Sequence, residues 1–290
     1  MTITTGTYAE LSPQGQEVAS YLEKLVGERK IEVPMLPEVA SRVLALSNDP
    51  DSDAAQLATL IQGDQALAGH VMRIANSAAY TPNASMVSLQ QAIARLGMGV
   101  ITEISLVASL NSKMFNAPDF NDRIAEIWAH ALCTALWGKE VARTSKRNVE
   151  ASFLCGLLHS IGRPVVLQSI SEYNQDHKLL VSNEEALVLE QLFHVAFGVV
   201  VVEKWGMPTI VQESVQYYQN YAESKRSVEQ AMVINAAAQL ASEMLTAAES
   251  DFDEVLSGAV FADLNLYEDD IDILKLKEET IISGLEAMRV

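Results

Sequence analysis

The sequence predicts an all-helical protein, and three observations carry that prediction. Apolar residues recur at helical spacing along almost the whole chain. Hydrophobic residues make up 49% of it and aromatic residues only 6%, with many Ala, Leu, Glu and Gln, which favour helix. The 290 residues include just 8 Pro and 14 Gly, which are few turn-forming residues for a sheet of many strands.

The first four helices are predicted from apolar stripes bounded by glycine or by capping residues. Ser52 or Asp53 is placed to cap the third helix and Asp64 the fourth, because short polar side chains accept the free amides of a first turn. Gly27 and Gly63 are placed to end the first and third helices. The stripes run through residues 18–26, 39–46, 57–61 and 67–75.

Three further helix starts share one four-residue pattern, a Ser followed three residues later by Gln or Glu. In this capping box the hydroxyl accepts an amide of the first turn, and the longer side chain reaches back to the amide of the Ser. The pattern precedes an apolar stripe each time. It occurs at Ser88 with Gln91, at Ser182 with Glu185, and at Ser227 with Gln230.

Two breaks in the helical pattern suggest the domain organisation. The clearer one, at 115–122, combines Pro, Asn and Asp between long helices, and a softer one lies near 221–227. We therefore expect an N-terminal helical subdomain over 1–118, a second helical subdomain over 119–225, and a C-terminal helical extension over 226–290.

Composition also narrows the expected location and partners. A formal net charge of −18 repels phosphate backbones, so we expect no nucleic-acid partner. The N-terminus lacks the basic and apolar regions of a signal peptide, and the densest apolar run, 199–202, stops at Glu203. Cys133 and Cys155 lie in apolar helical patterns, as buried reduced thiols do. We expect a cytoplasmic protein without a membrane contact.

Three stretches of the chain carry a family resemblance. They are LPEVASRVLALSNDP at 36–50; LIQGDQALAGHVMRIANSAAY at 60–80 with AIARLGMGVITEISL at 92–106; and the segment from FLCGLLHSIGRPVVL to HVAFGVVVVEKWGMP at 153–208. Their order and spacing resemble the HDOD family, a relative of the HD-domain metal phosphohydrolases. The resemblance covers about residues 30–220 and implies that 119–225 is an HD-like subdomain, with 1–118 packed on it and 226–290 completing its bundle.

Each residue that marks the resemblance also has a structural explanation. Asn76 follows the apolar stripe of a helix, and Asn tolerates the left-handed conformation that ends one. Gly97 stands where the next helix should end, and Trp205 to Pro208 form a helix stop with Trp205 filling the core. Gln65 departs from the Pro usual in the family, at little cost in a first turn. The marking residues are Asp64, Asn76, Ser77, Gly97, Trp205 and Pro208.

The resemblance also implies a metal site that has lost its carboxylates. Active HD-domain enzymes hold divalent metals with a His, a later His-Asp pair and a final Asp, and the metals activate the attacking water. Here the first His resembles His130, and the pair resembles His159 with Ser160. The final Asp aligns with Ala238. Without carboxylates we expect no hydrolysis and no cofactor.

Three histidines are left, and they allow two interpretations. Relatives that cleave cyclic dinucleotides have further His residues; His194 resembles one, whereas Tyr217 and Tyr218 stand where a His pair is expected. Together His130, His159 and His194 could bind a transition metal. The alternative is that they are hydrogen-bonded residues of a helical core.

Three functions remain open on the sequence. The first is a non-catalytic interaction module in bacterial signalling that contacts a histidine kinase, response regulator, chemotaxis protein or cyclic-di-GMP enzyme, with exposed aromatics at Tyr217, Tyr218 and Tyr221 as its contact surface. The second is a divergent metal-dependent phosphohydrolase. The third is a small-ligand sensor that holds a nucleotide in the vestigial pocket. The sequence leaves the oligomeric state open.

Overall fold

The all-helical prediction is confirmed. A computed structural model describes residues 8, 11–81, 86–110, 114–178, 181–246 and 252–288, and every regular element among them is a helix. In chain order the elements are α1 (Pro13–Gly27), α2 (Glu38–Asn48), α3 (Ala54–Gln62), α4 (Gln65–Ala75), α5 (Leu89–Ser109), the 3₁₀ helix η2 (Pro118–Phe120), α6 (Asn121–Thr144), α7 (Val149–Leu158), α8 (Gly162–His177), α9 (Asn183–Lys204), α10 (Thr209–Tyr217), the 3₁₀ helix η3 (Tyr218–Glu223), α11 (Val228–Thr246), α12 (Phe252–Leu256), α13 (Ala259–Asp263), α14 (Glu268–Lys275) and α15 (Glu278–Met288).

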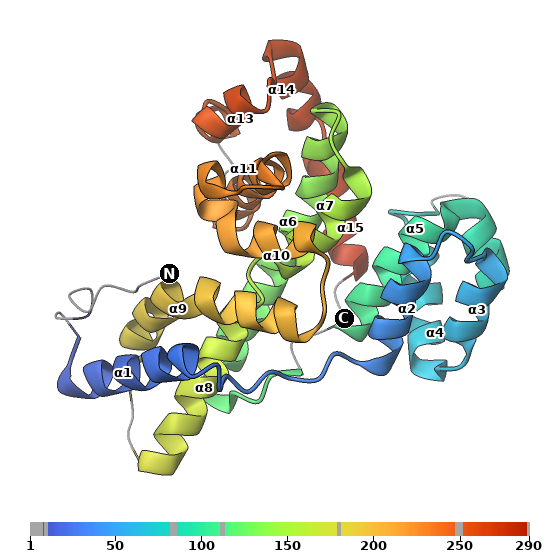
Figure 1. Cartoon of the computed structure of the whole chain (residues 1–290). Helices are drawn as coiled ribbons and strands as arrows, with labels where there is room; N and C mark the ends of the chain where they lie inside the picture. The colour runs from blue at the N-terminus through green and yellow to red at the C-terminus, as the bar shows by residue number, and fades with distance from the viewer. Residues whose placement is uncertain are drawn as a thin grey trace.

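Helices α2 to α5 pack on one another in an N-terminal cluster, on the right of Figure 1. The starts of α3 and α4 follow the predicted capping chemistry. Asp53 and Gln56 form a reciprocal capping box before α3, with N–O distances of 2.8 and 3.0 Å. Asp64 caps α4 by accepting the amide of Leu67 at 3.0 Å. The polar residues therefore set where these helices begin.

Asn76 ends α4, but the left-handed conformation predicted for it is wrong, because its φ is −88°. Its side chain instead joins two separate parts of the chain. Oδ1 accepts the amide of Met86 at 2.6 Å, and Nδ2 donates to the carbonyls of Met72 and Met86, each at 3.0 Å. Gly97, by contrast, has a φ of 85° and breaks α5 in two, as a glycine at a helix end does.

The three other predicted helix starts are found, but with a changed hydrogen-bond pattern. Ser88 and Ser182 each accept the amide three residues on, at 3.2 Å. Ser227 immediately precedes α11. The long side chains differ in their partners: Gln91 accepts the amide of Val87 at 2.9 Å, whereas Gln230 donates to Ser152 Oγ at 3.0 Å across to α7. The pattern therefore predicted where the helices begin but not the hydrogen-bond partner of the Gln or Glu side chain.

The long helix α6 is the centre of the second part of the fold, with α7 and α11 packed along it and α8 paired with α9 (Figure 1). Two glycines allow this close packing. A Cβ on Gly156 would lie 2.6 Å from Ala135 Cα, and one on Gly162 would lie 1.9 Å from the carbonyl oxygen of His194. The turn between α7 and α8 is thus held directly against α6 and α9.

Helix α1 does not pack with the N-terminal cluster predicted over 1–118. It lies against α8 and α9, and the segment 28–37 leads from it across to α2 (Figure 1). The end of α9 holds that segment, because Lys204 Nζ donates to the Ile31 carbonyl at 2.7 Å and Trp205 Nε1 to the Pro34 carbonyl at 2.9 Å. Trp205 is half-buried at the edge of the core rather than filling it.

The C-terminal helices connect the two parts of the fold. Helices α12 and α13 pack on α11, α14 packs on α6, and α15 contacts both α6 and α5. Arg73 of α4 also donates to the carbonyl of Ala287 in α15, at 3.3 Å. The end of the described chain is thus tied to its first helical cluster.

Three helical segments are long and apolar enough to cross a membrane by length and composition alone. In this fold a large share of each is buried inside the protein: 44% for Leu89–Ser109, 83% for Val149–His177 and 61% for Asn183–Lys204. Much of their apolar surface therefore forms the core. Cys133 and Cys155 are both buried, as the sequence predicted.

We predict that Gly162→Ala destabilises the protein, because the new methyl group meets backbone of α9 that cannot move independently. Overpacking of this kind costs at least about 1–3 kcal/mol. The matched control is Gly69→Ala at an exposed position of α4, where nothing lies within 4 Å and stability should rise by about 0.5–1 kcal/mol. Urea unfolding of the two variants checks both signs. Equal stability of Gly162→Ala and the parent would contradict the packing described.

Candidate functional site

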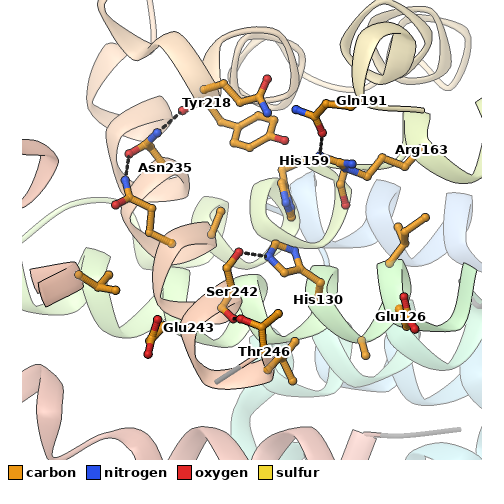
Figure 2. A pocket seen from close by; sticks show the side chains of 18 of the residues that line it. Glu126, His130, His159, Arg163, Gln191, Tyr218, Asn235, Ser242, Glu243 and Thr246 are labelled. Atoms are coloured by element: carbon orange, nitrogen blue, oxygen red, sulfur yellow. Dashed lines mark hydrogen bonds between the residues drawn. The ribbon is translucent and has the colours of Figure 1, made fainter. Parts of the chain in front are cut away.

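A cleft of about 1020 Å³ lies among α6, the α7–α8 turn, η3 and α11. It gathers four of the five positions that the resemblance assigned to the vestigial metal site, namely His130, His159, Ser160 and Ala238. Polar side chains from several elements also face it, among them Tyr218, Asn235 and Ser242 (Figure 2). The remaining position, His194, does not line the cleft.

His130 points into the cleft from α6 and is already hydrogen-bonded. Its Nε2 lies 2.9 Å from Ser242 Oγ, and its Nδ1 lies 3.5 Å from Thr134 Oγ1 (Figure 2). Burial, reinforced by the positive charge of Arg163, lowers the pKa of His130 to about 4. The imidazole is therefore neutral at physiological pH.

His159 and Ser160 lie on the α7–α8 turn, and both are 2% exposed. His159 Nδ1 lies 2.6 Å from the Gly156 carbonyl oxygen, so Nδ1 carries the proton and Nε2 is an acceptor. The rings of His159 and His130 are 5.5 Å apart. Burial holds the pKa of His159 well below its ordinary value, with a further contribution from His130.

Tyr218 corrects the prediction of an exposed aromatic contact surface, because it is buried rather than exposed. Its ring lies edge-on to His159 at 4.9 Å, and its hydroxyl lies 3.3 Å from His194 Nε2. His194 Nδ1 lies 2.9 Å from the Gln191 carbonyl, so both ring nitrogens of His194 are used. Tyr217 and Tyr221 are only half-buried, and Tyr221 bonds to Asp263.

A buried carboxylate forms the wall behind the cleft. Glu190 of α9 is 0% exposed and accepts Nε and Nη2 of Arg123, each at 2.9 Å, and Nη1 of Arg163 at 2.6 Å. Burial alone would raise the pKa of Glu190, but hydrogen bonds from the two guanidinium groups hold it below its ordinary value. Removing one partner of such a buried pair costs about 3–5 kcal/mol.

The charges around the cleft offset one another. Arg123 and Arg163 face the buried carboxylate, and Arg123 also bonds to Glu126 at 3.2 Å. Among the described residues no group of three or more His, Cys, Asp or Glu is arranged to hold a metal ion. At the two positions where the resemblance expects carboxylates, Ser160 and Ala238 offer a divalent cation no negative charge.

Sequence reasoning missed the ion-pair residues. Glu190 stands inside an apolar helical stretch, and a carboxylate there needs a buried partner. Arg163 follows His159 by four residues, which places both side chains near one turn. Both features could be recognised in the sequence. The pairing of Glu190 with Arg123 could not, because Arg123 lies on a helix that is distant in the chain.

The chain belongs to the HDOD domain family, whose model matches residues 33–221. A protein of Treponema pallidum (strain Nichols), itself uncharacterized, is 21% identical over 220 residues, which are 72% of this chain and 42% of that protein. The chain thus spans less than half the length of this curated relative.

Solved structures share the whole fold. A protein from Shewanella amazonensis SB2B, named for a proposed metal-dependent phosphohydrolase activity, superposes with a TM-score of 0.72 at 22% identity, covering 96% of this chain and all (100%) of that one. An HDOD domain protein of unknown function from Geobacter sulfurreducens gives 0.72 at 17% identity, covering 94% and 97%. A protein from Marinobacter aquaeolei VT8, named for a proposed role in signal transduction, gives 0.69 at 22%, covering 94% and 66%. At these identities the likeness establishes the fold alone.

We predict that stability falls between pH 6.5 and about pH 4 because of the buried histidines. Burial lowers the pKa of both His130 and His194 to about 4, whereas in the unfolded chain they take up protons near pH 6.5. In that window the unfolded state binds more protons, so acidification favours unfolding by up to about 1.4 kcal/mol per pH unit for each histidine. Their contribution is fully present above pH 6.5.

Chemical denaturation from pH 8 to pH 4.5 measures this slope. A His194→Gln variant should lose part of it, whereas Val71→Ala in the N-terminal cluster should lower stability at every pH without changing the slope. A slope unchanged in His194→Gln would show that this ring is not held neutral by the fold.

Proposed function

We propose that the chain is a regulatory module of bacterial signalling that acts through protein contacts and does not hydrolyse phosphoesters. The observation that carries the proposal is the chemistry of the vestigial site. Ser160 and Ala238 stand where HD-domain enzymes have carboxylates, and both line the cleft. Neither side chain can neutralise or bridge divalent metals as an Asp does.

The hydrogen bonds of the histidines support the same proposal. A metal ligand needs a free imidazole nitrogen, but His194 has both nitrogens in hydrogen bonds, and His130 Nε2 faces Ser242. A metal-bound state would have to break these contacts. Within the described part of the chain His159 keeps Nε2 free, and one imidazole is too few ligands for a metal site. The Marinobacter aquaeolei protein is named for a proposed role in signal transduction, which agrees with this proposal, but its likeness to this chain is one of fold alone.

The test is to identify partners by cross-linking in the cell of origin and then to rebuild the complex from purified proteins. We expect a histidine kinase, response regulator, chemotaxis protein or cyclic-di-GMP enzyme to be enriched over an unrelated acidic protein of equal abundance. The purified pair should associate equally well with and without EDTA, because the contact needs no metal.

The contradicting result is equally specific. It would be the absence of any signalling protein among the cross-linked partners, together with turnover of a phosphodiester by the purified chain that His159→Ala abolishes. That combination would favour the divergent phosphohydrolase instead.

A further inference from the structure

Two polar atoms in the cleft have no partner in the part of the chain that the structure describes. Ser160 Oγ is buried and makes no hydrogen bond there. The next residue back, His159, uses Nδ1 for the Gly156 carbonyl and leaves Nε2 as a free acceptor. An unpaired buried polar group costs about 1–3 kcal/mol. Ser160 Oγ is such a group, and it lies on the residue next to the free acceptor of His159 in the lining of the cleft.

The lining of the cleft favours neither an anionic nor a cationic ligand. Its charged lining residues are Arg123, Arg163, Glu126 and Glu243, two of each sign. Both guanidinium groups are bonded to the buried Glu190, so little positive charge remains for an anion. The imidazoles are neutral, as their lowered pKa values require. A charged ligand would lose hydration in the cleft without gaining an opposite charge.

The remaining lining is apolar and uncharged-polar. The apolar part is formed by Ile127, Ala129, Ala238, Leu245 and Val255. Amide and hydroxyl groups from η3 and α11 supply further hydrogen bonds, among them Asn235 and Ser242 (Figure 2). A volume of about 1020 Å³ lies at the upper end of the range for small-molecule sites.

We propose that this cleft binds a neutral small molecule with an apolar body and an amide-like head. The head donates an N–H to His159 Nε2 and accepts the Ser160 hydroxyl, and the body lies along the apolar lining. A primary amide or lactam carries a donor and an acceptor side by side, as the two adjacent residues require. This site goes beyond the signalling role proposed above and does not depend on it.

The experiment uses three probes with the same ring and different charges: benzamide, benzoate and benzamidine. Protein-observed NMR titrations measure the dissociation constant of each at millimolar concentrations. We expect benzamide to bind, with shifts centred on His159 and Ser160, and the anionic and cationic probes to bind at least about tenfold more weakly, the cost of desolvating an uncompensated charge.

Variants of the chain test the two contacts. Ser160→Ala should weaken benzamide binding about three- to tenfold, the contribution of one neutral hydrogen bond. It should fold normally, because it removes a hydroxyl that has no partner among the described residues. The matched control is Ser105→Ala on α5, where the buried hydroxyl donates to the Ile101 carbonyl far from the cleft lining. His159→Phe provides a second variant that keeps an aromatic ring but removes the Nε2 acceptor, together with the Nδ1 donor to the Gly156 carbonyl.

Three results would overturn the proposal. One is equal or tighter binding of benzoate or benzamidine, which would assign the cleft to a charged ligand. Another is unchanged benzamide affinity in both Ser160→Ala and His159→Phe. The third is no benzamide binding to the parent chain at the highest soluble concentration.

Discussion

The ion pair of buried Glu190 with Arg123 and Arg163 is the constraint on which the site depends. It joins α6, α8 and α9 at one point; α6 carries His130, α9 carries His194, and α8 begins two residues after Ser160. A carboxylate with no exposed surface is tolerated only when charge and hydrogen bonds compensate it, and here two guanidinium groups do so. Both guanidinium groups are therefore paired with Glu190, and most of their charge is compensated before any ligand binds.

This arrangement explains why the histidines remain neutral. Burial lowers the pKa of His130 and His194, and the positive charge of Arg163 lowers both further. Neutral rings with their nitrogens in hydrogen bonds are stable parts of a helical core. Ser160 and Ala238, which the resemblance aligns with two carboxylates of HD-domain enzymes, both line the cleft.

The sequence predicted well what local hydrogen bonds decide. Asp53, Asp64 and Ser182 cap their helices through atoms three residues away, and Gly97 ends a helix by adopting a positive φ. These contacts are made between residues that are close in the chain, so they can be recognised from the sequence alone. The resemblance likewise led to His130 and His159, which lie in one cleft.

What the sequence could not show depends on contacts between distant residues. Helix α1 packs against α9, and the segment after α1 is bonded to the end of α9 by Lys204 and Ile31, which are 173 residues apart in the chain. Tyr218 looked like a surface aromatic, because a helical pattern does not distinguish a tyrosine facing solvent from one facing a cleft. The partners of Glu190 lie 67 and 27 residues away and were missed for the same reason.

The metal content of the protein, purified without a metal-binding tag and measured by mass spectrometry, tests whether the histidine cleft holds a metal ion. We predict far less than one equivalent of manganese, iron or zinc per chain, because Ser160 and Ala238 supply no carboxylate and His130 Nε2 is already hydrogen-bonded to Ser242. Near-stoichiometric metal that is lost in His159→Ala would contradict it, since the histidines would then be ligands and hydrolysis would again be a candidate activity.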